Sequence, residues 1–157
     1  MKKLFILIFL AINLIVINWN IYQKEMILKY GKTIFLELAP VDPRSLMQGD
    51  YMRLRYRIAE DIKTKTQIQN KDGYLVLSID NFGRAEFVRF HSKKIKLNEN
   101  EILLKYRNRG NILKLGAESF FFQEGKACLY QKAKYGELKV SKSGESLLID
   151  LKNTIDF

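Results

Sequence analysis

Three arginines alternate with apolar residues shortly after Gly49. Arg53, Arg55 and Arg57 are each separated by one residue, so on a β-strand they would share one face. The opposite face would be apolar, with Met52, Leu54, Tyr56 and Ile58. A guanidinium group must reach solvent, a carboxylate or a phosphate-like group, because burying it unpaired is very costly. The row therefore predicts either a solvated sheet face or an anion-binding face.

Two carboxylates stand on either side of a run of three phenylalanines. Glu118 and Glu124 lie six residues apart, and if the run is a strand, at least one of them lies near the core. Such a carboxylate would need a cation, and Arg53, Arg55 and Arg57 are the candidates. The alternative is a pair of exposed turn carboxylates. A hydrolase built on the two acids is weakly supported, because spacing along a strand does not fix their separation across a cleft.

Other catalytic arrangements find little support in the sequence. Ser45 precedes Gly49-Asp50 as the nucleophile of a signal-peptidase-type hydrolase would, but the Ser-Met-x-Pro signature of such enzymes is absent. That chemistry would also need a neutral lysine as base, and no lysine stands in a recognisable catalytic context. The only cysteine, Cys128, and the only histidine, His91, cannot supply an ordinary zinc site. The sequence thus favours a domain without catalysis, metal or cofactor.

The elements that must position these residues begin with an apolar N-terminal segment. Leu4 to Tyr22 is a run of nineteen residues without a charge, long enough for the roughly 30 Å hydrocarbon core of a bilayer. Lys2 and Lys3 precede the run and Trp19 lies near its end, which predicts a cytoplasmic N-terminus and an extracytoplasmic remainder. In a Gram-negative cell the remainder would be periplasmic. Basic residues also follow the run, at Lys24, Lys29 and Lys32, and weaken this charge asymmetry.

We expect the segment to stay attached as an anchor. A cleaved signal peptide would end in a small-x-small site, whereas the run ends in Asn, Trp, Ile and Tyr residues. Helical spacing continues to Tyr30, and Gly31 is a natural C-terminal cap. The predicted organisation is therefore an anchor with a juxtamembrane helix at 1–31 and one domain at 32–157.

The remainder of the chain predicts short strands separated by turns. Strand candidates are 33–38, 51–58, 74–79, 85–90, 102–107, 119–122, 138–141 and 146–151, and 125–135 is the one helix candidate. Glycine-containing turns separate several of them, as at Asn81-Phe82-Gly83 and Lys142-Ser143-Gly144. This spacing predicts a mainly β domain, an antiparallel β-sandwich or a partly open barrel with one short helix.

The chain is basic as well as small. It has 157 residues and a formal net charge of +10. Such an excess fits a compositional bias or an anionic lipid surface better than nucleic acid, because the charges are spread along the chain behind an apolar segment. We expect no nucleic-acid partner.

Two blocks of sequence resemble a known family. The stretch GDYMRLRY has Gly49, Asp50, Tyr51, Leu54 and Tyr56 at the five fixed positions of the GDYXXLXY motif. The preceding PVDPRSLMQ and the later G-x-E-x-x-F-x-x-E-G block, 116–125, followed by YGELKV, continue the likeness, although relatives commonly have a proline before the acid of the second block. The chain therefore resembles the GDYXXLXY family of bacterial membrane-anchored proteins, which is functionally uncharacterised.

On physical grounds, Gly49 permits a tight turn, Asp50 can accept backbone hydrogen bonds there, and Leu54 and Tyr56 anchor the strand in the core.

The resemblance implies a membrane partner, because family members often occur with larger multi-spanning proteins. We expect a non-catalytic accessory domain that assists an integral membrane complex. Binding of an anionic envelope lipid or polymer through the arginine face is the alternative, beside the hydrolase that would use Ser45.

Overall fold

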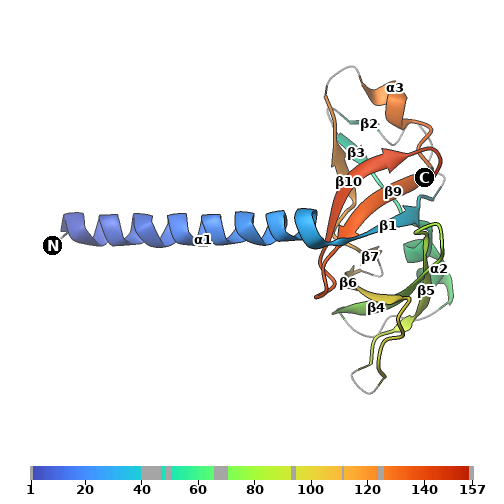
Figure 1. Cartoon of the computed structure of the whole chain (residues 1–157). Coiled ribbons are helices and arrows are strands. Elements are labelled where there is room, and N and C mark those ends of the chain that lie inside the picture. The colour runs from blue at the N-terminus through green and yellow to red at the C-terminus, as the bar shows by residue number, and fades with distance from the viewer. Residues whose placement is uncertain are drawn as a thin grey trace.

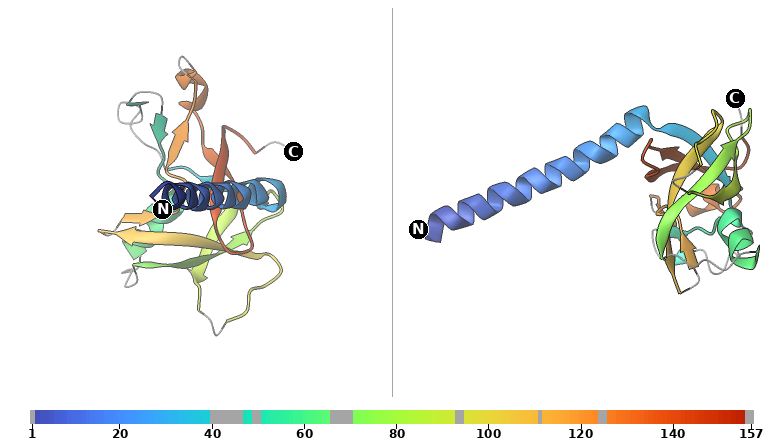
Figure 2. Two further views of the ribbon diagram at one scale, coloured as in Figure 1. Left: turned by 90° about the vertical axis from the view of Figure 1, so that its left-hand side faces the viewer. Right: turned by 90° about the horizontal axis from the view of Figure 1, so that it is seen from below.

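A computed structural model describes residues 2–39, 47–48, 51–65, 71–92, 95–110, 112–123 and 126–155 of the chain. It consists of a long helix and a small β domain at the C-terminal end of that helix (Figure 1). The helix projects away from the domain in the right-hand view of Figure 2. The anchor-like segment and the β-rich remainder are thus distinct parts of the structure.

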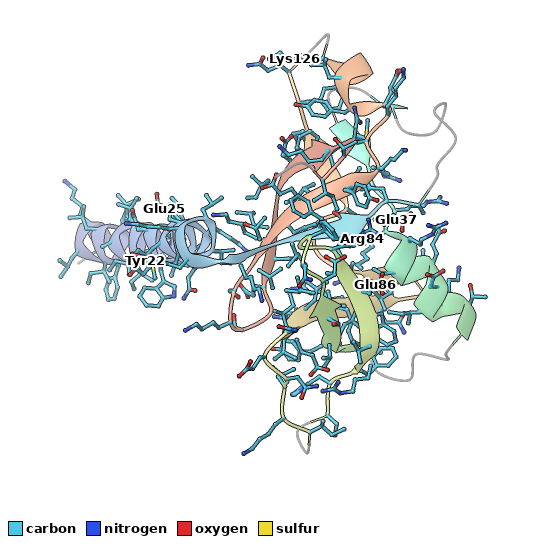
Figure 3. All side chains as sticks on the ribbon, turned by 45° about the vertical axis from the view of Figure 1, so that its right-hand side comes forward. Tyr22, Glu25, Glu37, Arg84, Glu86 and Lys126 are labelled. Carbon is cyan, nitrogen blue, oxygen red and sulfur yellow. The ribbon has the colours of Figure 1, made fainter. Side chains whose placement is uncertain are left out.

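The N-terminal helix α1, Lys2–Tyr30, is long and apolar enough to cross a membrane. Its side chains from residue 3 to residue 26 are exposed, and around Tyr22 and Glu25 they project into open space (Figure 3). The three asparagine side chains of the apolar run donate to the carbonyl four residues earlier, each at 2.8 Å: Asn13 to Phe9, Asn18 to Leu14 and Asn20 to Val16. This internal bonding lowers the cost of placing the three amides in hydrocarbon.

Helix α1 ends where the sequence predicts. The Gly31 N–H donates to the Ile27 carbonyl at 2.8 Å, and a Cβ at Gly31 would lie only 2.4 Å from the same oxygen. Ile27 is 4% exposed against the β domain, and Lys139 Nζ donates to the Leu28 carbonyl at 2.5 Å. The last helical turns are therefore docked on the domain rather than joined to it by a loose linker.

Two sheets form most of the domain, and all the pairings between their strands are antiparallel. The first has the order β1-β9-β10, and the second has the order β5-β4-β6-β7. Their strands are β1 Lys32–Glu37, β9 Tyr135–Val140, β10 Ser146–Lys152, β4 Asp72–Ile79, β5 Ala85–Phe90, β6 Glu101–Arg109 and β7 Ile112–Lys114. A bridge between Phe35 and Arg84 joins the two sheets. Glu37, Arg84 and Glu86 are drawn at this junction in Figure 3.

A third, smaller sheet carries the recognisable sequence blocks. Its order is β2-β3-β8, with β2 Met47–Gln48, β3 Tyr51–Arg53 and β8 Ser119–Phe121. A bridge between Leu38 and Tyr56 connects the segment after β3 to the end of β1. The prediction of a mainly β, antiparallel domain behind an apolar helix is confirmed, and of the two predicted architectures, sandwich and partly open barrel, the structure has the second.

The helix prediction needs a correction. The expected strand 51–58 ends at Arg53, and the chain enters helix α2, Arg57–Lys65, which the sequence analysis missed. Ile58 and Ile62, one helical turn apart, are 9% and 2% exposed, so their spacing was the available signal. The helix expected at 125–135 is shorter, α3 Ala127–Tyr130. Strand β7 was also missed, since its three residues are too few to show a period.

The core lies between the two larger sheets and is built from alternate strand positions. The members of this core cluster that are 0% exposed come from four strands: Ile34, Leu36, Leu75, Leu77, Leu104 and Leu138. Val76, also 0% exposed, lies between Leu75 and Leu77 in β4 and is not part of the cluster. The segment after Gly49 adds Met52, Leu54 and Tyr56 to the same cluster. The core therefore fixes the position of the motif relative to β1 and β9.

Candidate functional site

The two sequence blocks that resemble the GDYXXLXY family lie against each other in the fold. Strand β3 of the first block pairs with β8 of the second, so that Met52 faces Phe120 and Arg53 faces Ser119. Beyond the strands, the Leu54 N–H donates to the Glu118 carbonyl at 2.8 Å. Residues more than sixty positions apart thus form one continuous piece of backbone pairing.

Tyr56 stabilises this pairing through a hydrogen bond inside the core. Its side chain is 2% exposed, and its hydroxyl donates to the Ala117 carbonyl at 2.6 Å. Burial, with a smaller contribution from the charge of Glu118, raises the pKa of the Tyr56 phenol well above its ordinary value. The hydroxyl is therefore a permanent hydrogen-bond donor and has no role as a base near neutral pH.

Glu118 holds the neighbouring turn. Its Oε1 accepts from the Leu115 N–H and, at 3.0 Å, from the N–H of Gly116, which has a φ of +84°. Of the two alternatives for Glu118, an arginine partner or a turn carboxylate, the described contacts fit the second, because Oε1 binds backbone amides of the turn. Among the described ion pairs, none joins Glu118 to Arg53, Arg55 or Arg57. This arrangement of Leu54, Tyr56 and residues 115–118 is called the motif lock below.

Gly136 allows the motif lock to close. A Cβ at this position would lie 3.2 Å from Cε1 of Tyr56 and 3.4 Å from its hydroxyl oxygen. The glycine of the YGELKV stretch therefore gives room to the tyrosine that ends GDYMRLRY. Sequence analysis placed both residues in the resemblance but could not pair them, because their contact exists only in three dimensions.

The arginines lie where alternation predicts, although the strand is short. Met52, Leu54 and Tyr56 are buried, whereas Arg53, Arg55 and Arg57 are exposed. Alternation continues past Arg53 because the backbone remains extended as far as the bridge between Tyr56 and Leu38. Helix α2 then begins at Arg57.

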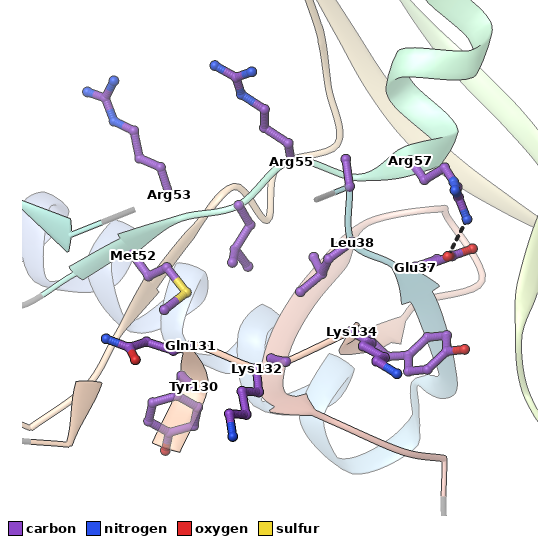
Figure 4. A pocket seen from close by; sticks show the side chains of 14 residues that line it. Glu37, Leu38, Met52, Arg53, Arg55, Arg57, Tyr130, Gln131, Lys132 and Lys134 are labelled. Carbon is purple, nitrogen blue, oxygen red and sulfur yellow. Dashed lines mark hydrogen bonds and ion pairs between the residues drawn. The ribbon is translucent and has the colours of Figure 1, made fainter. Parts of the chain in front are cut away.

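A groove of about 350 Å³, called the arginine groove below, runs beside these residues. Its walls are the segment 52–57, the end of β1, and the segment between α3 and β9 (Figure 4). Arg53 and Arg55 extend in the same direction, whereas Arg57 pairs with Glu37 (Figure 4). Among the described residues, Arg53 and Arg55 have no carboxylate within ion-pair distance.

The opposite wall of the groove combines an aromatic ring with further cations. The ring of Tyr130 packs on Phe120 and Phe122, with centroids 4.9 Å and 5.7 Å apart, which holds α3 against β8. Lys132 and Lys134 follow Tyr130 along the same wall. The groove therefore presents an apolar floor, including Leu38 and Met52, between positively charged rims.

These groups equip the groove for binding. Cations beside an apolar surface suit a segment that carries both carboxylates and apolar side chains. The described residues contain no group of three or more His, Cys, Asp and Glu side chains able to hold a metal ion.

Several expected site residues lie outside the described part of the chain. They are Gly49, Asp50 and Glu124, together with Ser45 of the hydrolase alternative. The backbone of Tyr51 is described as the start of β3, but its side chain is not. The roles expected for these residues remain predictions.

The helix, the small antiparallel domain and the motif lock define a class of protein with one apolar N-terminal helix docked on a β-rich domain. A comparison with protein families matches the GDYXXLXY protein family over residues 13–151. The chain therefore belongs to the GDYXXLXY family, as the two sequence blocks predicted. Comparisons with curated proteins and with solved structures give no match.

Proposed function

We propose that this chain is a single-pass membrane protein whose β domain is a non-catalytic accessory module for an integral membrane partner. Its N-terminus would lie in the cytoplasm and residues 32–157 outside it, in the periplasm of a Gram-negative cell. The arginine groove would receive an exposed segment of the partner. No chemical step is assigned to the domain.

The observation that carries this proposal is the docking of α1 on the domain. Ile27 is buried and Lys139 Nζ donates to the Leu28 carbonyl. These contacts fix the orientation of the β domain relative to the apolar helix. A domain held in this way keeps a fixed height and direction above the bilayer, and its groove has a limited set of neighbours. Other proteins of the same membrane are the neighbours that it meets by lateral diffusion.

The charge and shape of the arginine groove indicate the chemistry of the partner segment. Arg53 and Arg55 are free of intramolecular ion pairs among the described residues, so they can pair with carboxylates at no internal cost. The apolar floor adds burial that salt does not weaken. An acidic segment with one or two apolar anchors fits both features.

Site-specific photo-cross-linking in native membranes tests the proposal. A photoreactive residue at Lys132 is expected to give a discrete adduct with a membrane protein, and the same probe at exposed Glu99 is expected to give none. Arg53→Glu combined with Arg55→Glu should reduce the adduct about tenfold or more, since two attractive pairs become repulsive. The matched control, Lys63→Glu with Lys96→Glu, changes exposed charges elsewhere and should leave the adduct unchanged. Equal loss in both variants would contradict docking through the groove.

An anionic envelope polymer, in place of a protein segment, is the alternative ligand of the arginine groove that Arg53 and Arg55 also support. Polymer binding through arginines alone should fade as the salt concentration rises from about 0.1 M to 1 M, where the Debye length falls to about 3 Å. Docking over an apolar floor should persist. Retention of the Lys132 adduct in 1 M salt therefore favours the protein partner.

Protease added to intact spheroplasts tests the orientation. The proposal expects trimming of the β domain to a membrane-embedded fragment that contains α1. Protection of the full chain until the spheroplasts are lysed would place the domain in the cytoplasm and would contradict the proposed topology.

A further inference from the structure

A second basic cleft lies at the base of the domain, beside the end of α1. It has a volume of about 440 Å³ and is distinct from the arginine groove, with which it shares no lining residue. Five cationic side chains line it together with two carboxylates: Lys24, Lys105, Arg107, Arg109, Lys114, Glu118 and Glu145. It is called the base cleft below.

The geometry of β6 and β7 concentrates the positive charge of the base cleft. Lys105, Arg107 and Arg109 occupy alternate positions of β6, so their side chains leave the same face at intervals of about 6.6 Å. On the neighbouring strand, Lys114 lies directly opposite Arg107. Like charges in such a cross-strand pair repel each other, and an anion between them would remove the repulsion.

The acids of the base cleft leave most of this charge unneutralised. Glu145 lies 3.9 Å from Lys24 and 4.0 Å from Lys105, and Oε1 of Glu118 accepts from the amides of the motif lock. The two acids offset two of the five positive charges. Asp72 faces Arg107 from the β4 side, without an ion pair within 4.0 Å. Within the described part of the chain, no ion pair involves Arg107, Arg109 or Lys114, which are therefore available to an external anion.

The position of Lys24 gives the height of the base cleft above the bilayer. Lys24 comes two residues after Tyr22, the last residue of the apolar run, so it stands about 3 Å beyond the hydrocarbon along the helix axis. At this height the phosphates of the lipid headgroups are the nearest abundant anions. The Lys24–Glu145 pair and the Lys139–Leu28 bond hold the domain close to the helix here.

We propose that the base cleft binds the phosphate of an anionic phospholipid from the bilayer that holds α1. Arg107 and Arg109 supply planar donors for phosphate oxygens, and Lys114 supplies the opposing charge. This inference rests on the proposed crossing of the membrane by α1, but it is independent of the partner expected at the arginine groove. It gives the domain a second attachment to the membrane surface and fixes its rotation about the helix.

Lipid retention tests the inference on the full chain. The protein is reconstituted in nanodiscs of equimolar phosphatidylcholine and phosphatidylglycerol, then released into the gas phase for native mass spectrometry of the lipids still bound. The unaltered chain should retain phosphatidylglycerol over phosphatidylcholine by about fivefold or more, on the scale of 1 kcal/mol for each cation at the surface. The variant Arg107→Gln with Arg109→Gln and Lys114→Gln should lose this preference.

A matched control removes the same number of charges elsewhere. Lys63→Gln with Lys96→Gln and Lys126→Gln alters exposed positions away from the cleft and should keep the preference. Thermal unfolding of each variant checks that the β domain is intact.

Each remaining outcome has a definite meaning. Preference retained by the cleft variant, lost equally in the control, or absent from the unaltered chain would overturn the base cleft as a lipid site. If the chain enters the nanodisc normally, each of these results leaves the anchor standing. Failure of the chain to enter the nanodisc would instead overturn the proposed membrane crossing, and the inference with it.

Discussion

At the scale of single residues, Tyr56 is the residue of the family motif that we expect to contribute most directly to folding stability. Its hydroxyl is the hydrogen-bond partner of the Ala117 carbonyl inside the core. Tyr56→Phe keeps the ring but removes the donor, so we expect the free energy of unfolding to fall by about 1–3 kcal/mol. Chemical denaturation of the full chain in detergent micelles measures the change. Tyr30→Phe, at a side chain 68% exposed, is the control and should change stability by less than about 0.5 kcal/mol.

A second prediction at this scale concerns the ion pair between Arg89 and Glu101, which joins β5 to β6. The two guanidinium nitrogens lie 2.5 Å and 2.9 Å from the carboxylate oxygens, and Asn98 N–H donates to the same carboxylate at 3.0 Å. The bond from Arg89, followed by that from Asn98, lowers the pKa of Glu101 from 4.5 to about 2. The ionised form is therefore favoured in the folded state.

The sign of the pH dependence follows from this lowered pKa. Stability contributed by Glu101 is fully present above pH 4.5, the unfolded value, and is lost as the pH falls through the folded value of about 2. Glu101→Gln should therefore lower the Tm at pH 7. The difference in Tm between this variant and the unaltered chain should shrink as the pH falls from 4.5 to about 2. Melting curves across the pH range measure this. Glu99→Gln, at an exposed neighbour, should show no such gap, and a gap of constant size down to pH 2 would contradict the assignment.

At the scale of elements, the junction of α1 with the domain depends on Gly31. A Cβ there would meet the Ile27 carbonyl at 2.4 Å and Cβ of Lys139 at 3.2 Å, so Gly31→Val must displace the helix end from β9. We expect a loss of about 1–3 kcal/mol and faster tryptic cleavage after Lys29 and Lys32. Time courses of proteolysis in micelles measure the second effect. Tyr30→Val adds the same branching next to the junction and should leave the cleavage rate close to that of the unaltered chain.

At the scale of the whole molecule, the β domain should fold without its helix. The core of the domain is supplied by its own strands, by α2 and by the segments between them. Among the side chains of α1 whose burial the structure describes, Ile27 alone is buried, and it lies outside the core cluster. A chain of residues 32–157 is expected to remain folded, with a Tm lowered by less than about 10 °C.

Membrane extraction separates the roles of the two parts. The full chain should stay with membranes washed in alkaline carbonate, whereas residues 32–157 should appear in the supernatant. A truncated domain that is unfolded by circular dichroism would show that α1 is part of the fold rather than an attachment to it.

Local sequence features predicted the elements whose signal is periodic or compositional. The apolar run of α1, the cap at Gly31 and strands such as β4, β5 and β10 follow from hydrophobicity and turn chemistry that neighbouring residues carry. Burial of Leu54 and exposure of Arg55 were also predictable, since extended backbone alternates its side chains. The same alternation hid the start of α2 at Arg57, because Arg57 and Ile58 fit a continuing strand as well as a helix.

The sequence by itself determined a long apolar helix, a mainly antiparallel β domain and membership of the GDYXXLXY family. These features depend on hydrophobic patterns of neighbouring residues and on motif residues at fixed spacing. Only the tertiary structure decided the partners of the site residues. Glu118 binds backbone amides, Tyr56 reaches Ala117, and four cations gather on β6 and β7 beside Lys24. These contacts join segments distant in the chain, and their geometry depends on strand order and register, which no short stretch of sequence contains.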